Sequence, residues 1–266
     1  MNIADPKALG FIGTGAIAES VITGLIRHAG FDGEVFISER TAARSQRLAD
    51  QFANVGIETD NQSIVDGSQW VFLSVLPEHA RDVLRELDFR SDQTLISLVA
   101  ALTIEEIVEL VTPVTRAHRI IPLPPIVHGV GPLPIYPPNP EIASVFNRCG
   151  HAIEIENEDH FSAFSAASSV MAAHHRLTAT IAAWIENHGL PPEMAADYAS
   201  HMVHSLAEME TRCSAEELNS LAHDCLTEGG LNEQVLAELH KAGWFEKLTR
   251  RLDRIAERLD AGKLLS

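Results

Sequence analysis

The stretch "ALGFIGTGAIAESVITGLI", residues 8 to 26, constrains the fold more than any other part of this chain. A short apolar strand runs into a Gly-Thr-Gly turn at 13–15, and apolar residues then recur at helical spacing. Two turn positions carry no side chain, so an anion can approach the backbone amides at the helix N-terminus. With Ala18 in the third small position, the pattern is the dinucleotide-binding fingerprint of a doubly wound sheet. By itself the motif is also compatible with a glycine-rich turn between a strand and a helix that binds no ligand.

A second apolar strand, "EVFIS", supports the fingerprint because it ends where such a sheet presents a strand tip to the adenosine ribose. An acidic residue there accepts from a ribose 2′-hydroxyl, whereas an arginine holds a 2′-phosphate. Arg40 with Ser38 and Thr41 favours NADP, and Glu39 favours NAD. We predict NADP, with NAD as the alternative. Arg44 could join the groups that hold a 2′-phosphate, but its simpler interpretation is a solvated helix charge.

Strand and helix patterns alternate through the first half of the chain, which predicts βαβ units and a parallel sheet. "WVFLSV" precedes a helix over 77–87, and "TLISLV" precedes one over 103–111 that opens with a Thr103–Glu106 capping box. The turn and the ends of these strands define the predicted cofactor-binding residues. They are Gly13, Thr14, Gly15, Ala16, Ile17, Ser38, Glu39, Arg40, Thr41, Ser74, Val75, Leu76, Pro77 and Ala100.

The segment 122–140 interrupts this alternation, because it holds eight of the thirteen prolines. Such a segment cannot be helical, and we expect an irregular extended stretch or edge strand beside the cofactor cleft. "AHRII" precedes it, and "HAIEIE" is expected to close the sheet near residue 156.

From residue 158 the pattern is helical, over 158–188, 191–210, 214–226 and 231–263. We therefore predict an α/β Rossmann-like domain with a doubly wound parallel sheet over 1–157, followed by an all-α domain over 158–266. The helix expected over 165–184 is rich in small residues. It is either an ordinary buried helix or the hub of an intertwined dimer.

Charge and composition exclude several function classes. With 20 basic and 37 acidic residues the net charge is −17, which disfavours binding to nucleic acid or anionic membranes. No apolar run is long enough to span a bilayer and no signal-peptide pattern opens the chain, so a cytoplasmic protein is expected. Three scattered cysteines predict neither a disulfide framework nor a structural zinc site, and no metal is expected.

At this point the chain resembles the pyrroline-5-carboxylate reductase family. The resemblance is carried, in the family's order, by "GFIGTGAIAESVITGLI", "VFLSVLPEHARDVLREL", "LISLVAALTIEEI", "RIIPLPP", "NHGLPPEMA" and "EGGLNEQVL". It implies a helical domain that interleaves with its partner in a homodimer, or a higher homo-oligomer of dimers. The implied reaction, of proline biosynthesis type, transfers hydride from the nicotinamide to a cyclic imino acid.

The departures from the family's pattern fall where the chemistry is expected. The family's Asn-Thr pair near the nicotinamide reads here Leu123-Pro124, so the substrate wall is more apolar. In the family a threonine pair follows a glycine pair, whereas in this chain Leu231 and Asn232 follow the glycines. The predicted substrate-binding residues are Gly229, Gly230, Leu231 and Asn232, whose backbone amides at a helix start could bind a carboxylate. Asn232 stands where the family has a hydroxyl that meets the substrate, although a helix-capping role is an alternative.

The predicted catalytic residues are Asn232, His175 and Ser169. A histidine one turn along the central helix is a suitable proton donor near neutral pH, but His174 and His175 point about 100° apart, so at most one faces the cleft. A core or surface histidine without a catalytic role is the alternative.

Two further functions compete with imine reduction. The loss of the family's polar residues near the substrate is also consistent with an NAD(P)-binding homologue. Such a protein would have lost or altered its activity and would act as a regulatory or interaction protein. A hydroxy-acid dehydrogenase is less consistent, because no lysine stands between Phe161 and His188.

Overall fold

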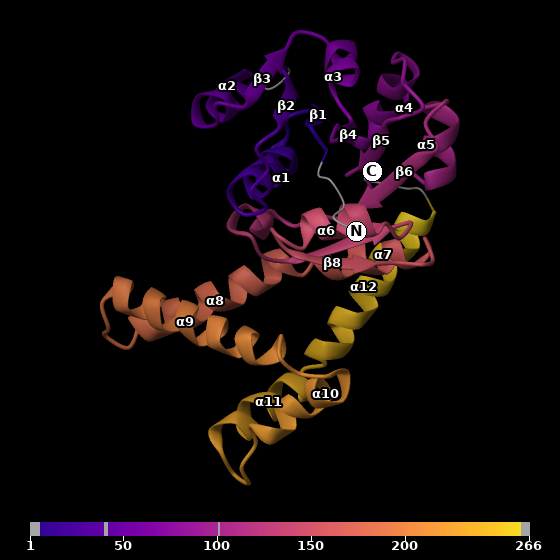
Figure 1. The fold of residues 1–266 in the computed structure, drawn as a ribbon. Helices are drawn as coiled ribbons and strands as arrows, with labels where there is room; N and C mark the ends of the chain where they lie inside the picture. Colours follow the sequence, from indigo (N-terminus) through magenta and orange to yellow (C-terminus); the bar gives the residue numbers. More distant parts are fainter. Residues whose placement is uncertain (1–5, 40–41, 101, 262–266) are drawn as a thin grey trace. The chain divides into compact units, whose positions relative to one another are not determined.

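The computed structural model describes residues 6–39, 42–100 and 102–261 (Figure 1). The chain divides into two compact units. Unit 1 contains Met1–Ser165 with Ala256–Ser266, and unit 2 contains Ala166–Ile255. The predicted domain boundary at residue 158 stays a prediction, and each unit is described by itself.

Unit 1 is built on one eight-stranded sheet with the order β3-β2-β1-β4-β5-β6-β7-β8. All neighbouring strands are parallel except β6 and β7, which are antiparallel. The strands are β1 (Ala8–Ile12), β2 (Glu34–Ser38), β3 (Val55–Glu58), β4 (Trp70–Leu73), β5 (Thr94–Ser97), β6 (Arg116–Ile120), β7 (Pro132–Tyr136) and β8 (His151–Glu154). The predicted Rossmann-like sheet is confirmed, and β8 closes it as expected.

The helices of unit 1 bury apolar faces on both sides of this sheet. They are α1 (Ala16–Arg27), α2 (Ala42–Gln51), α3 (Asn61–Gly67), α4 (Pro77–Arg85), α5 (Ile104–Leu110) and α6 (Pro140–Phe146). One core cluster joins α1, α2 and α6 to the sheet, and a second joins α3, α4 and α5 to it. Because each face has its own core, the sheet is wound on both sides and its strand tips stay free for a site.

The proline-rich segment differs from its prediction. It contains a 3₁₀ helix, η1 (Pro124–His128), and strand β7, which lies between β6 and β8 rather than at an edge. A proline lacks the N–H that a strand interior needs but keeps its carbonyl, and Pro134 O accepts from Ile121 N at 3.2 Å. The short antiparallel pairing with β6 therefore tolerates prolines that the sequence argument treated as an obstacle to an internal strand.

The helices after the sheet are α7 (His160–Ser168), α8 (Met171–Glu186), α9 (Pro192–Glu210), α10 (Ala215–Asp224), α11 (Leu231–Lys241) and α12 (Trp244–Asp260). The prediction of one continuous helix over 165–184 is wrong, because the chain turns at Ser169 and Val170. Their N–H groups bond to the carbonyls of Ala166 and Ala167, three residues back, so the α-helical pattern ends there.

Unit 2 has almost no core of its own. Among its described hydrophobic residues, those that are buried are the small Ala166, Ala195 and Ala199. Its helices instead expose large apolar side chains. These include Leu177, Trp184, Met194, Tyr198, Leu206, Met209, Leu218, Leu231, Val235 and Trp244. None of the helices in the described part of the chain is long and apolar enough to cross a membrane.

Candidate functional site

The Gly-Thr-Gly turn leaves the start of α1 open. Gly13 has φ +92°, and a Cβ there would lie 2.5 Å from Ser74 O, so only glycine fits. Gly15 is the N-cap of α1 and provides no side-chain cap hydrogen bond. The first turn, which includes Ala16 and Ile17, therefore presents backbone amides and the positive end of the helix dipole. This arrangement suits a pyrophosphate.

Ser38, at the tip of β2, fixes the shape of the turn. Its hydroxyl accepts from Gly13 N at 3.1 Å, and its carbonyl accepts from Thr14 Oγ1 at 2.9 Å and from Ser45 Oγ at 2.8 Å. The Ser38 and Thr14 side chains are both buried. Ser38 was predicted to lie among the groups around a 2′-phosphate, whereas its hydroxyl bonds to the backbone just after β1.

A cavity of about 440 Å³ lies at the ends of β1, β2 and β3. Its lining residues are Gly13, Ser38, Glu39, Ala42, Glu58, Thr59, Asp60, Asn61, Val75 and Val83. The hydrogen bond from Ser63 N, which also caps α3, holds the pKa of Asp60 below its ordinary value. Arg40 and Thr41, the predicted 2′-phosphate contacts, lie outside the described residues.

Arg44 lies against the glycine turn. Its Nε is 2.7 Å from Glu19 Oε2, and its Nη1 donates to Thr14 O at 3.4 Å. The side chain is partly buried, so its interpretation as a solvated helix charge is wrong. Glu19 also pairs with Arg47 at 2.6 Å. The sequence could not reveal this pairing, because it joins α1 to α2.

The predicted cofactor residues after β4 border the same edge of the sheet. Ser74 N donates to Ile12 O at 2.9 Å, which continues the β1–β4 pairing, and Val75 lines the 440 Å³ cavity. Leu76 is the N-cap of α4, with Pro77 in the first helical turn. The Leu76 side chain is 60% exposed and offers apolar surface beyond the strand tip.

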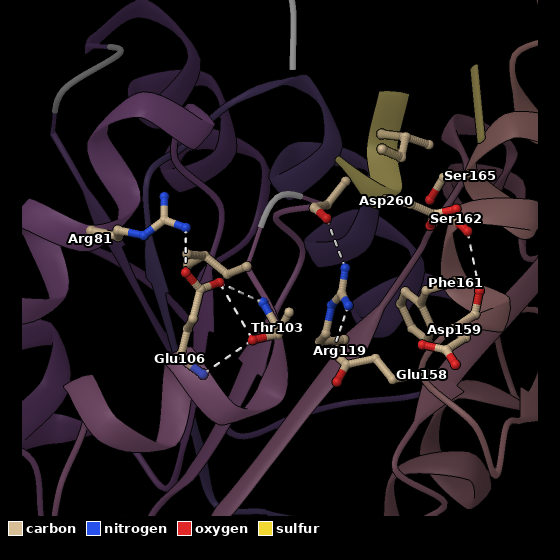
Figure 2. A pocket seen from close by; sticks show the side chains of 13 residues that line it. Arg81, Thr103, Glu106, Arg119, Glu158, Asp159, Phe161, Ser162, Ser165 and Asp260 are labelled. Carbon is tan, nitrogen blue, oxygen red and sulfur yellow. Dashed lines mark hydrogen bonds and ion pairs between the residues drawn. The ribbon is translucent and has the colours of Figure 1, made fainter. Parts of the chain in front are cut away.

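A second cavity, of about 540 Å³, lies at the ends of β5 and β6 (Figure 2). Ion pairs line it, and all its residues belong to unit 1. They are Arg81, Ala100, Leu102, Thr103, Glu106, Arg119, Glu158, Asp159, Phe161, Ser162, Ser165, Leu259 and Asp260. Arg81 pairs with Glu106 at 2.5 Å, and Glu106 also completes the predicted capping box with Thr103.

Arg119 is a buried cation in this cavity. Its Nη1 donates to Glu158 Oε1 at 2.6 Å, its Nη2 donates to Ala100 O at 2.8 Å, and its guanidinium lies 4.5 Å from the Phe161 ring centroid. Glu158 Oε1 also accepts from Ile104 N at 2.9 Å. No role was predicted for Arg119 or Glu158. The available signal was an arginine inside the apolar strand "AHRII".

Two buried titratable groups lie elsewhere in unit 1. Burial lowers the pKa of His118, whose Nδ1 lies 3.0 Å from Pro137 O and whose Nε2 lies 3.1 Å from Asn139 Nδ2. Such partners suit a neutral ring that donates at Nδ1 and accepts at Nε2. Burial raises the pKa of the Cys149 thiol to about 12. Among the described residues, no group of three or more His, Cys, Asp or Glu side chains could hold a metal ion.

In unit 2, the predicted substrate-binding residues surround the start of α11. Gly230 is the N-cap, so the alternative that Asn232 caps the helix is wrong. Asn232 Nδ2 donates to Cys225 O at 3.0 Å. Gly229 N donates to Glu233 Oε2 at 2.6 Å, and Gly230 N donates to Thr227 O at 2.8 Å. Two amides expected to bind a substrate carboxylate are therefore already bonded within the chain.

The other predicted catalytic residues lie on or beside α8. His175 lines a cavity of about 500 Å³ between α8 and α9, together with Glu193 and Asp197. His174 is not among the described residues of that lining, although the two rings are 5.5 Å apart. Ser169 Oγ donates to Ala166 O at 2.6 Å, where the chain turns between α7 and α8.

Two family models match the chain. The model "NADP oxidoreductase coenzyme F420-dependent" matches residues 8–101, and "Pyrroline-5-carboxylate reductase dimerisation" matches residues 158–261. A pyrroline-5-carboxylate reductase of Pisum sativum is 25% identical, with 91% of this chain and 91% of the relative covered.

Solved structures agree in fold. That of 1-pyrroline-5-carboxylate reductase from Streptococcus pyogenes has a TM-score of 0.81 at 22% identity, covering 97% of this chain and 98% of the other. That of Plasmodium falciparum pyrroline carboxylate reductase with NADP bound has a TM-score of 0.81 at 19% identity, with the same coverage.

The start of the second family model agrees with the structure. The last strand of the sheet, β8, ends at Glu154, and the dimerisation model begins at residue 158. The class defined in this way is the NAD(P)-dependent oxidoreductases. Within that class, the chain is similar to pyrroline-5-carboxylate reductases, through the dimerisation model over residues 158–261 and through the Pisum sativum relative over 91% of its length. The dimerisation model, together with the exposed apolar side chains of unit 2, indicates a homo-oligomer.

Proposed function

We propose that this protein uses NADPH to reduce the C=N bond of a small cyclic imino acid, with pyrroline-5-carboxylate as the leading substrate. It acts in the cytoplasm as a homodimer and takes small molecules rather than nucleic acid, in keeping with its net charge of −17. The observation that carries the proposal is the uncapped start of α1 beside Gly13, where the backbone leaves space for a phosphate.

The residues present fit a dinucleotide. Among the described residues, the amides at the start of α1 would bind its pyrophosphate, Glu39 would lie beside the adenosine ribose, and Leu76 would offer apolar surface beyond β4. Arg40 is assigned to the ribose from the sequence alone. When bound, the nicotinamide supplies the hydride.

The chain's own polar groups must then orient and protonate the substrate. Asn232 Nδ2 donates to Cys225 O, so we assign its Oδ1 to accept from the iminium N–H of the substrate. His175 is the proposed proton donor. The amides of Gly229 and Gly230 already donate hydrogen bonds within the chain. A substrate carboxylate therefore has fewer free donors here than the sequence suggested.

These committed amides, together with the apolar Leu123 and Pro124, favour a particular substrate preference. A compact imino acid loses water around its charges and regains fewer hydrogen bonds at an apolar wall. We therefore expect pyrroline-5-carboxylate to show a high KM and an imine with a larger apolar substituent to be preferred. The same observation supports the second candidate, an NAD(P)-binding homologue with lost or altered activity.

Consumption of NADPH or NADH by the purified protein tests both candidates. The assay compares pyrroline-5-carboxylate, bulkier cyclic imines and keto acids, and measures cofactor affinity separately. Turnover of an imine supports the proposed reductase. Tight NADPH binding without turnover of any imine or keto acid would favour the regulatory homologue instead.

A further inference from the structure

Figure 2 shows Arg119 and Glu158, which form a buried ion pair. This pair bonds to the backbone between β5 and α5 at two points. Ala100, in the loop between these elements, is one of the predicted cofactor-binding residues. We infer that Arg119 and Glu158 are positioning residues, which hold the loop in the conformation that receives the nicotinamide half of the cofactor. This inference rests on the proposed function.

One contact lies within the loop, at Ala100, and the other lies at its end, where α5 begins at Ile104. Arg119 Nη2 donates to Ala100 O at 2.8 Å, and Glu158 Oε1 accepts from Ile104 N at 2.9 Å. The same carboxylate oxygen accepts from Arg119 Nη1 at 2.6 Å, which links the two contacts. Leu102, between them, is fully buried. In the described part of the loop, the backbone is therefore held at Ala100 and Ile104, and the side chain of Leu102 is buried.

Stability alone does not account for this pair. Its two charges lose hydration on burial, and apolar side chains of similar volume commonly stabilise a fold as well or better. The Arg119 side chain is only 8% exposed, and Phe161 covers its guanidinium. Apolar replacements would not bond to Ala100 O or to Ile104 N. What the charged pair provides is a defined backbone geometry for the loop.

The topology assigns this loop to the nicotinamide half. In a doubly wound sheet the dinucleotide lies across the point where the strand order reverses, here between β1 and β4. The adenosine half then lies over β2, beside the 440 Å³ cavity. The loop after β5 lies on the other side of the switch point. Loosening the loop should therefore weaken contacts to one half of the cofactor only.

The test compares the affinities of two ligands, NADPH and 2′-phospho-ADP-ribose, for the full-length protein and its Glu158→Gln variant. Glutamine keeps the shape of the side chain and removes the charge that holds Arg119. We expect the Kd for NADPH to rise about tenfold, because binding must then order the loop, and the Kd for 2′-phospho-ADP-ribose to stay unchanged. Arg81→Gln is the matched control, since it breaks an ion pair in the same cavity, leaves the Glu106 cap in place and should change neither Kd.

Arg119→Lys provides a second, independent variant should Glu158→Gln fail to fold, and we expect the same selective loss. Lysine keeps the positive charge but has a single nitrogen in place of the two that bond to Glu158 and to Ala100, so it does not reproduce the forked geometry. Equal weakening of both ligands, or no change in either, would overturn the positioning role. If the unmodified protein binds neither ligand, the proposed function itself fails, which is a distinguishable result.

Discussion

The two units of this chain use apolar residues in opposite ways. Unit 1 buries them in two clusters, one on each face of an eight-stranded sheet. Unit 2 buries alanines in its described part and leaves Trp184, Tyr198 and Leu231 exposed. A unit that hides its apolar surface folds around its own core, whereas one that exposes such side chains in number is completed by another surface. The contrast assigns cofactor binding to a self-sufficient framework and assembly to a region that needs its partner.

The largest expected effect comes from placing a charge on the exposed face of unit 2. Tyr198→Glu should dissociate the oligomer, because a carboxylate buried without a partner at an interface costs about 3 to 5 kcal/mol. Light scattering measures the mass in solution. Glu210→Gln, a polar change on the same helix α9, should leave the mass unchanged. An unchanged mass for Tyr198→Glu would mean that this face does not take part in assembly.

Substitutions in the glycine turn should act on unit 1 alone. Gly13→Ala should lower both stability and NADPH affinity, by about 2 to 4 kcal/mol in total, because its Cβ would meet Ser74 O in a backbone conformation that disfavours side chains. Gly15→Ala is the sharper variant. At Gly15 the nearest atom to an added Cβ is 4.0 Å away, so the fold should tolerate alanine while the approach of a pyrophosphate is hindered. Thermal unfolding with NADPH titration separates the two effects, and unchanged NADPH affinity in Gly15→Ala would contradict the phosphate site.

Asn232→Ala tests the chemistry assigned to unit 2. We expect kcat/KM to fall by roughly ten- to a hundredfold, which corresponds to about 1.4 to 2.7 kcal/mol, with cofactor affinity intact. Steady-state kinetics with the preferred imine measures the change. Full activity in this variant, or efficient turnover of pyrroline-5-carboxylate relative to bulkier imines, would argue for the ordinary activity of the family.

Arg40→Ala tests the choice of cofactor in unit 1. Binding of NADPH should weaken by about 1 to 3 kcal/mol, the size of a lost charge-assisted hydrogen bond, while NADH binding stays nearly constant. Titration of both cofactors measures the difference. Equal changes in the affinities for NADPH and NADH would contradict the NADP assignment and would indicate that Glu39 binds the ribose.

The smallest effect concerns the dependence of stability on pH. Burial lowers the pKa of His118, so the unfolded chain takes up a proton there before the folded chain does. Its contribution is fully present above the ordinary value of about 6.5 and is lost as the pH falls from there toward the folded pKa, by at most about 1.4 kcal/mol per pH unit. His118→Gln should flatten this part of the curve of unfolding free energy against pH.

The same contrast explains what the sequence could reveal. Strands β1, β2, β4 and β5 carry short apolar runs, and the turn before α1 has a short-range signature, so both were predictable. Helix α2 has only Ser45 and Leu48 buried, and β3 is four residues long with a glycine inside, so neither has a clear apolar period. The break at Ser169 depends on local hydrogen bonds within a run that favours helix on composition.

The candidate site divides in a similar way. Gly13 and Gly15 were identified because a phosphate turn depends on neighbouring residues. Arg119 and Glu158 were missed because they pair across 39 positions, and Arg44 was misread because its partner Glu19 lies on another helix. Interactions between distant segments leave no local spacing to detect.

The raised pKa of Cys149 has a consequence for how this protein can be handled. A thiol reacts as its thiolate, so a buried thiol with a pKa of about 12 stays unreactive toward alkylating reagents and mild oxidants near neutral pH. Cys213 and Cys225, the other two free cysteines, both belong to unit 2. A thiol-reactive dye therefore labels the assembly region selectively in the native protein without any engineered cysteine, and the sheet that holds the cofactor site stays unlabelled.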